Sequence, residues 1–192
     1  MQILDAYIQK FINSHINSSA SDLMLKASSY PEWDMKAIAQ QLVGKQIAKK
    51  KLPTWFQNNE ILYPVRLSME QCSSETTAKY KTTIINSGRG IDLTGGYGVD
   101  TIFLSKQSES LIYCERNEDL ASLVNHNFKA LNQHNCEVHV GDGVEYLKNL
   151  KSENRYNLQN HPKIKKNKQM DFLYWSTTVS YTHLTLPTKR IV

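Results

Sequence analysis

Short apolar runs alternate with helical patterns between Arg89 and Trp175, and this alternation constrains the fold of the 192-residue chain more than any other feature. The runs of strand length read RGIDL, SLIYCE, CEVHV and MDFLYW. The helical patterns between them read VDTIFLSK, EDLASLVNHNFKAL and GVEYLKNL. Such alternation is typical of βαβ units with right-handed crossovers, which build a parallel sheet. We therefore predict an α/β fold for this part of the chain.

The first part of the chain lacks this alternation and is mostly helical. Apolar residues at helical spacing, Tyr7 among them, predict a helix over 3–16. Asp34 is a candidate cap for a second helix, which the basic run KQIAKKK ends before Pro53. The stretch SSETTAKYK predicts a third helix, capped by one of its two serines. We therefore divide the chain into a helical N-terminal segment (1–66), a sheet domain (67–175) and a tail (176–192).

An acidic residue follows each of the first three predicted strands. These residues are Asp92, Glu115 and Asp142, and a turn with the sequence TGGYG follows the first of them. Because parallel sheets bind ligands at the carboxyl ends of their strands, we expect the three acids to share one cleft. Glycines in the turn would let the backbone approach a ligand that a Cβ would keep away. The pattern favours a nucleoside ligand.

The first acid discriminates between nucleoside ligands. A carboxylate at Asp92 would repel the pyrophosphate of a dinucleotide, but it suits the ammonium and sulfonium of S-adenosylmethionine. Glu115 lies 23 residues further on, where a carboxylate can accept the ribose hydroxyls. Asp142 can accept from an exocyclic amine such as adenine N6. Two alternatives remain open: an NAD(P)- or flavin-dependent oxidoreductase, and an α/β domain whose acids are only caps.

These motifs resemble those of a known family. DLTGGYGVDT, YCERN and VGDG are similar to motifs I, II and III of class I S-adenosylmethionine-dependent methyltransferases, although Thr94 stands where motif I has its first glycine. The upstream stretches KKKLPTW and LSMEQCSSETTAKYK resemble a bacterial group of these enzymes with a helical N-terminal segment and a C-terminal THUMP-like domain. The resemblance covers roughly residues 26–174.

The resemblance implies a fold, a cofactor and a set of binding residues. It implies a Rossmann-like sheet of order 3-2-1-4, incomplete beside the seven strands of the family, and S-adenosylmethionine as methyl donor. An RNA base would be the acceptor. The residues implied in cofactor binding are Asp92, Thr94, Gly95, Gly96, Gly98, Glu115, Asp142 and Gly143. The segment containing Ser74, Glu75 and Lys79 would lie over the cofactor pocket.

The chain departs from the family after the fourth predicted strand. An Asp-Pro or similar motif that faces the sulfonium in these enzymes is absent, so no catalytic residue is assigned. The tail VSYTHLTLPTKRIV resembles a translated sequencing adapter, and we expect the natural sequence to have been cut near Tyr174, the alternative being a genuine C-terminal strand with a basic end. Strand four would then be an uncovered sheet edge. On this view the chain is poorly stable and inactive, and a non-catalytic nucleoside-binding fragment is a further alternative.

Composition adds weaker constraints. The net charge of +5 is compatible with an RNA partner without requiring one. Three scattered cysteines and six histidines show no metal-binding spacing, so we expect no metal site. We see neither a secretory signal nor a membrane-spanning run, and expect a cytoplasmic protein. Lysines of KQIAKKK, with Trp55 and Phe56 nearby, suit an RNA contact or, as we prefer, an ordinary helix end.

Overall fold

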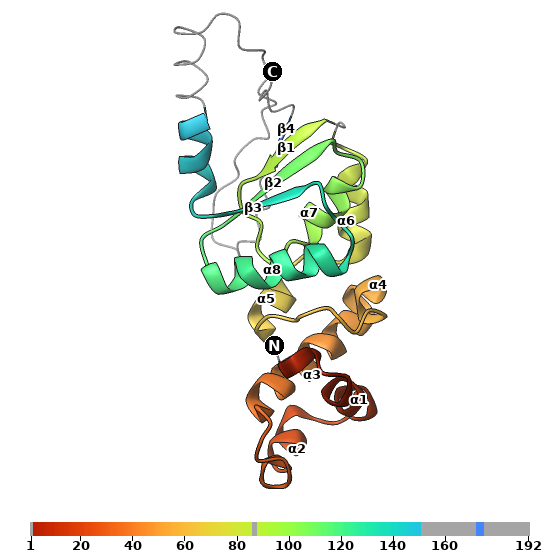
Figure 1. Cartoon of the computed structure of the whole chain (residues 1–192). Coiled ribbons are helices and arrows are strands. Elements are labelled where there is room, and N and C mark those ends of the chain that lie inside the picture. The colour runs from red at the N-terminus through yellow and green to blue at the C-terminus, as the bar shows by residue number, and fades with distance from the viewer. Residues whose placement is uncertain (1, 86–87, 151–171, 175–192) are drawn as a thin grey trace, which may run out of the picture.

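A computed structural model describes residues 2–85, 88–150 and 172–174, the last of these by their backbone only. The polar stretch 151–169 and the tail that resembles an adapter lie outside the described residues. Figure 1 shows an elongated arrangement, with the N-terminal helices at one end and the sheet at the other. A pocket lies between α5 (Arg66–Gln71) and the loop that follows the first strand, β1 (Arg89–Asp92).

A four-stranded parallel sheet is the centre of the second half of the chain. Its strands are β1 (Arg89–Asp92), β2 (Ser110–Glu115), β3 (Cys136–Val140) and β4 (Phe172–Tyr174). They lie in the order β3-β2-β1-β4, and every neighbouring pair is parallel. In register, Asp92 lies beside Tyr113 of β2 and Tyr174 of β4. The α/β class and the strand order 3-2-1-4 expected from the sequence are confirmed.

Helices cover both faces of this sheet. The alternating residues of β2 divide between the two faces, as a strand buried on both sides requires. Tyr113 packs with residues of α7 (Val99–Ser105) and α8 (Glu118–Ala130), whereas Ile112 and Cys114 pack with Tyr146 and Leu147 of the helix over 143–150. Helix α6 (Glu75–Thr82) lies beside α7 at the edge of the sheet (Figure 1).

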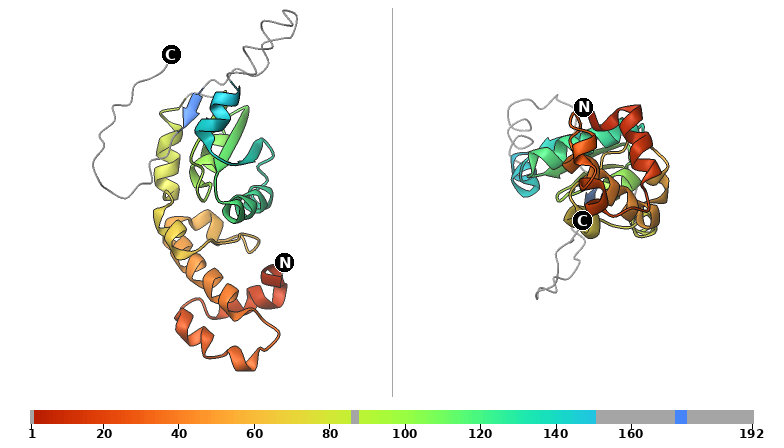
Figure 2. Two further views of the ribbon diagram at one scale, coloured as in Figure 1. Left: turned by 90° about the vertical axis from the view of Figure 1, so that its left-hand side faces the viewer. Right: turned by 90° about the horizontal axis from the view of Figure 1, so that it is seen from below.

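The N-terminal segment consists of packed helices. Asp5 caps α1 (Ala6–Ser14) and Asp34 caps α3 (Met35–Lys51), each by accepting from backbone amides of the first turn. The remaining elements are short: η1 (Gln2–Leu4), α2 (Ala20–Met24), η2 (Ala27–Ser29), α4 (Pro53–Phe56) and α5 (Arg66–Gln71). In Figure 2 the long α3 runs from the N-terminal helices toward the sheet.

One sequence prediction about this segment is wrong in detail. Tyr7 was placed on the apolar face of the first helix, but its side chain is 79% exposed. The core face of α1 is instead formed by Ile8, Phe11 and Ile12, which pack against Leu42 and Ile38 of α3. Tyr7 fits the periodicity because it lies one position from this face, where a tyrosine can remain in water.

A buried asparagine joins the segment 61–63 to the sheet domain. The Asn127 side chain of α8 donates to the carbonyl of Leu62 at 2.8 Å and accepts from the amide of Leu62 at 2.9 Å. The Tyr97 hydroxyl, from the turn after β1, donates to the same carbonyl at 2.8 Å. Because this extended segment has no strand partner, side chains satisfy its buried backbone groups.

Candidate cofactor-binding site

The turn after β1 is shaped by two glycines with positive φ. Gly96 has φ of 53° and Gly98 has φ of 75°. An added Cβ at Gly98 would lie 2.7 Å from Cγ1 of Val124, so the turn passes close to α8 there. At Gly96 the nearest atom to an added Cβ would be the Thr94 carbonyl oxygen at 4.0 Å. Gly96 therefore faces open space, and only its backbone conformation favours glycine.

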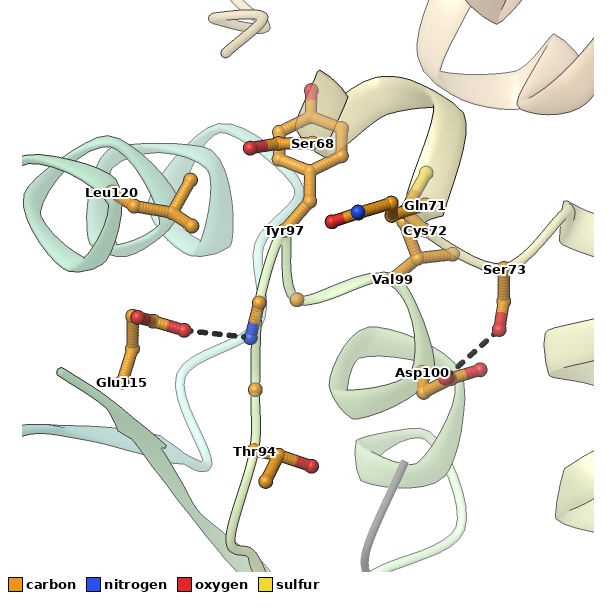
Figure 3. Close-up of a pocket in the computed structure, with 13 residues that line it drawn as sticks. Ser68, Gln71, Cys72, Ser73, Thr94, Tyr97, Val99, Asp100, Glu115 and Leu120 are labelled. Carbon is orange, nitrogen blue, oxygen red and sulfur yellow. Dashed lines mark hydrogen bonds between the residues drawn. The ribbon is translucent and has the colours of Figure 1, made fainter. Parts of the chain in front are cut away.

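A pocket of about 180 Å³ lies between this turn and α5. Figure 3 shows the turn on one side, with side chains of α5 and of the loop before α6 opposite. Thirteen residues line it: Ser68, Gln71, Cys72, Ser73, Thr94, Gly95, Gly96, Tyr97, Gly98, Val99, Asp100, Glu115 and Leu120. The two charged side chains in this lining are both acidic.

Glu115 lies at the end of β2 and faces the turn. Its Oε2 accepts from the amide of Gly96 at 3.1 Å (Figure 3), and its Oε1 accepts from the amide of Asn117 at 2.8 Å. The second bond holds the carboxylate at the start of α8. The structure thus places Glu115 with Thr94, Gly95, Gly96 and Gly98 in the lining of one pocket, and cofactor binding by these residues stays a prediction.

Asp92 occupies a different place from the one expected. Its side chain is fully buried and does not line the pocket. It accepts from the amide of Thr94 at 3.1 Å and from the hydroxyl of Thr101 at 2.6 Å. Burial raises the pKa of this carboxyl to about 7, against the effect of the two hydrogen bonds. The expected direct contact with a ligand is therefore corrected: Asp92 fixes the turn from behind.

Asp142 and Gly143 also lie outside the pocket lining. Asp142 accepts from the amides of Val144 and Glu145 at 2.8 and 3.0 Å, and it pairs with Arg116. The bond from the Glu145 amide and the Arg116 guanidinium lower the pKa of Asp142. Gly143 passes so close to Leu93 that an added Cβ would lie 2.4 Å from its carbonyl oxygen. We expected the three acids to share one cleft. This expectation is corrected, because Glu115 lines the pocket and Asp92 and Asp142 do not.

The segment upstream of the sheet contributes to the pocket through residues that sequence reasoning missed. Ser74 caps α6, and Glu75 is buried against the amide of Thr54 at 3.0 Å, with Lys79 paired to it at 3.1 Å. None of Ser74, Glu75 and Lys79 lines the pocket. The lining comes instead from the preceding residues, which are Ser68, Gln71, Cys72 and Ser73.

Asp100 is the second acid of the pocket, and the sequence did not single it out. It follows Gly98 by two residues, so its proximity to the glycine turn could have been noticed. Its side chain accepts from Ser73 at 2.9 Å and from Lys81 at 2.7 Å, both on Oδ2. The pocket therefore has one carboxylate from each of two elements, the start of α7 and the end of β2.

Other residues considered from sequence have structural roles. Cys114 is fully buried in β2, and burial raises its pKa to about 12. Trp55 is 1% exposed, so it cannot stack on a base. Lys51 donates to the carbonyls of Met69 and Glu70 at 2.9 and 2.6 Å. These carbonyls lie in the last turn of α5, where a cationic side chain is favourable. Among the described residues no group of His, Cys, Asp or Glu is arranged to hold a metal ion.

The fold and the site place the chain in a structural class. It is 32% identical to a solved "putative methyltransferase" from Porphyromonas gingivalis W83, with a TM-score of 0.62. The match covers 77% of this chain and 37% of that chain. The chain thus has the Rossmann-like fold of methyltransferases and spans just over a third of that relative. No protein-family model and no curated protein matches it.

Two more distant solved structures are also methyltransferases. An O-methyltransferase from Bacillus cereus, solved in complex with S-adenosylhomocysteine (SAH), is 14% identical over 84% of this chain and 62% of its own, with a TM-score of 0.43. An rRNA methylase from Streptococcus thermophilus is 19% identical over 35% of this chain and 41% of its own, with a TM-score of 0.32. Likeness at this level carries no argument about what this chain binds.

In the part of the chain that the structure describes, no helix combines the length and apolar character needed to cross a membrane.

Proposed function

We propose that the chain is the cofactor-binding portion of an S-adenosylmethionine-dependent methyltransferase. The observation that carries this proposal is the pairing of the Gly96 turn with Glu115 in a pocket whose charged lining residues are acidic. The likeness to the Porphyromonas gingivalis protein supports the same class. S-adenosylmethionine supplies a methyl group on a positively charged sulfur, which a nucleophile displaces in line.

The residues present fit this cofactor. Gly96 faces open space where a side chain would otherwise stand, so a ligand can lie against the turn. Glu115 can accept both ribose hydroxyls, because a carboxylate has about four acceptor positions and uses two of them, on the amides of Gly96 and Asn117. A side chain at position 95 would collide with the Tyr113 ring, because a Cβ added to Gly95 would lie 2.0 Å from a carbon of that ring. The turn is thus held in the shape that the ligand would need.

The charge of the pocket disfavours the main alternative. No cationic side chain is among the described lining residues, whereas the pyrophosphate of a dinucleotide would lie beside the turn and Asp100. Asp100 and Glu115, rather than the buried Asp92, would therefore repel the pyrophosphate. A cationic donor is favoured by both carboxylates.

We further propose an RNA base as the acceptor and the cytoplasm as the location. The motif resemblance supports both of these finer proposals, and the net charge of +5 is compatible with an RNA partner. Asp142, which follows β3 and pairs with Arg116, would read adenine together with the backbone after it, at Gly143. We name no catalytic residue, since the segment after β4 lies outside the described residues.

Thermal unfolding of residues 1–192 with different ligands tests the proposal. A ligand at a hundred times its dissociation constant adds about 2.7 kcal/mol of stability. We expect SAH to raise the melting temperature and NAD and NADP to leave it unchanged. Stabilisation by NAD without stabilisation by SAH would reject the assignment. Transfer of a labelled methyl group into total RNA, compared with total protein, tests the acceptor class.

A further inference from the structure

Asp100 lies at the point where the glycine turn becomes helix α7. Its side chain lines the pocket but is only 7% exposed. Gly98 and Val99 precede it in the same lining, and Ser73 faces it from the loop before α6 (Figure 3). This is a carboxylate that is almost removed from solvent and still borders a cavity.

Two donors from another element hold this carboxylate. The Ser73 hydroxyl donates to Oδ2 at 2.9 Å, and the Lys81 ammonium contacts the same oxygen at 2.7 Å. Lys81 also donates to the Ser73 hydroxyl at 2.8 Å, so the three side chains form a closed triangle. A buried carboxylate needs such partners to remain charged. The triangle therefore fixes the position of Asp100 and pairs its carboxylate with a cation.

Asp92, the neighbouring acid, is a weaker source of negative charge. It is fully buried behind the turn, and burial is the main cause that raises its pKa to about 7. Its hydrogen bonds to Thr94 and Thr101 are internal to the turn and α7. Of the two acids beside the turn, Asp100 is the one that both lines the pocket and has a cationic partner.

We propose that Asp100 binds the α-ammonium of the donor's amino-acid end, with Ser73 and Lys81 as positioning residues. This inference rests on the proposed function and assigns one end of the same ligand. The two donors take only part of the acceptor capacity of a carboxylate, which offers about four lone-pair sites. The ammonium would approach from the cavity while Lys81 stays on the α6 side. Glu115, at the end of β2, would be left to the ribose.

Ligands with and without the ammonium test this assignment by calorimetric titration of residues 1–192. SAH carries the amino-acid end, 5′-methylthioadenosine lacks it, and deaminated SAH lacks only the ammonium. We expect the unmodified chain to bind deaminated SAH at least about 10-fold more weakly than SAH, which is about 1.4 kcal/mol. Equal affinities for these two ligands would overturn the inference without any mutation.

Asp100→Asn tests the residue itself. We expect it to weaken SAH binding about 10-fold, leave 5′-methylthioadenosine within about twofold, and abolish the preference for SAH over its deaminated form. Asp119→Asn, the same change at an exposed position of α8, should alter none of these. Equal loss for SAH and 5′-methylthioadenosine, or no loss for either, would contradict the role of Asp100.

Ser73→Ala is a second variant that tests the assignment even if Asp100→Asn does not fold. It removes one donor to Asp100 and keeps the Lys81 pair, so we expect a smaller loss of about threefold, for SAH only. A loss that is equal for all three ligands would indicate a merely structural triangle. Failure of the unmodified chain to bind either SAH or 5′-methylthioadenosine would reject the proposed function, whereas binding without preference rejects only the inference.

Discussion

The amide of Gly96 donates to the carboxylate of Glu115 at 3.1 Å, which joins the glycine turn after β1 to the end of β2. These residues lie 19 positions apart in the chain, and the parallel pairing of β1 with β2 brings them together. This bond orients the carboxylate of Glu115 toward the pocket. A ribose bound there would contact the glycine turn and Glu115 at the same time.

Glu115→Gln should weaken the binding of adenosine-containing ligands. A neutral amide loses the charge-assisted bonds to the ribose hydroxyls, which are each stronger than a neutral bond by roughly 1 kcal/mol. We expect the affinity for 5′-methylthioadenosine to fall at least about 10-fold in calorimetric titration. Glu118→Gln, at an exposed position of α8, is the matched control. Unchanged affinity in Glu115→Gln would show that Glu115 does not bind the ribose.

Alanine at the two turn glycines should separate stability from binding. Gly98→Ala combines a left-handed backbone with a contact of 2.7 Å to Val124, so we expect a loss of about 2–4 kcal/mol in urea unfolding. Gly96→Ala meets no such contact and should cost about 1 kcal/mol. Its methyl group should nevertheless weaken SAH binding. Equal destabilisation by both variants would argue against the open space at Gly96.

Asp92 should make stability fall as the pH rises. Its pKa is about 7 in the folded protein and 3.8 in a free aspartate, so the folded state holds the extra proton between these values. The contribution is fully present below about pH 3.8 and is lost as the pH rises through 7. One such proton gives a slope of up to about 1.4 kcal/mol per pH unit.

Asp92→Asn should remove this slope, because an amide does not titrate. Urea unfolding between pH 4.5 and about 8 checks this, with Asp119→Asn expected to keep the slope of the unmodified chain. Parallel stability curves for the unmodified chain and Asp92→Asn would show that Asp92 is charged throughout.

Asn127→Ala should destabilise the chain through the segment 61–63. It leaves the buried amide of Leu62 without an acceptor, at a cost of about 1–3 kcal/mol, whereas the carbonyl of Leu62 keeps the bond from Tyr97. We expect a melting temperature lower by about 5–10 °C. Asn125→Ala, exposed on the same helix, should change it little. Comparable stability of the two variants would mean that Asn127 does not anchor this segment.

Much of the fold could be predicted from the sequence, because strands and helices alternate with clear periodicity after residue 88. The caps at Asp34 and Ser74 were recognisable, since their side chains precede helical patterns. Helices α2, α4 and α5 were not predicted, as each has six residues or fewer and no complete apolar face. Tertiary packing rather than local pattern stabilises such short helices.

The site could be predicted only in part. Position along the chain placed three acids at strand ends, but it could not show where their side chains point. Thr101, nine residues after Asp92, donates to that buried carboxylate, and Arg116 pairs with Asp142 outside the pocket lining. Asp100 was missed because an acid in the first turn of a helix also fits an ordinary capping role. Its contacts with Ser73 and Lys81 depend on the packing of α6 beside α7.

A crystal structure of the chain with SAH tests the central claim most directly. We predict that the nucleoside lies against Gly96, with both ribose hydroxyls on Glu115 and the ammonium beside Asp100. Crystals grown with excess SAH whose pocket between the glycine turn and α5 holds no ligand, or holds one with its ribose away from Glu115, would contradict the account.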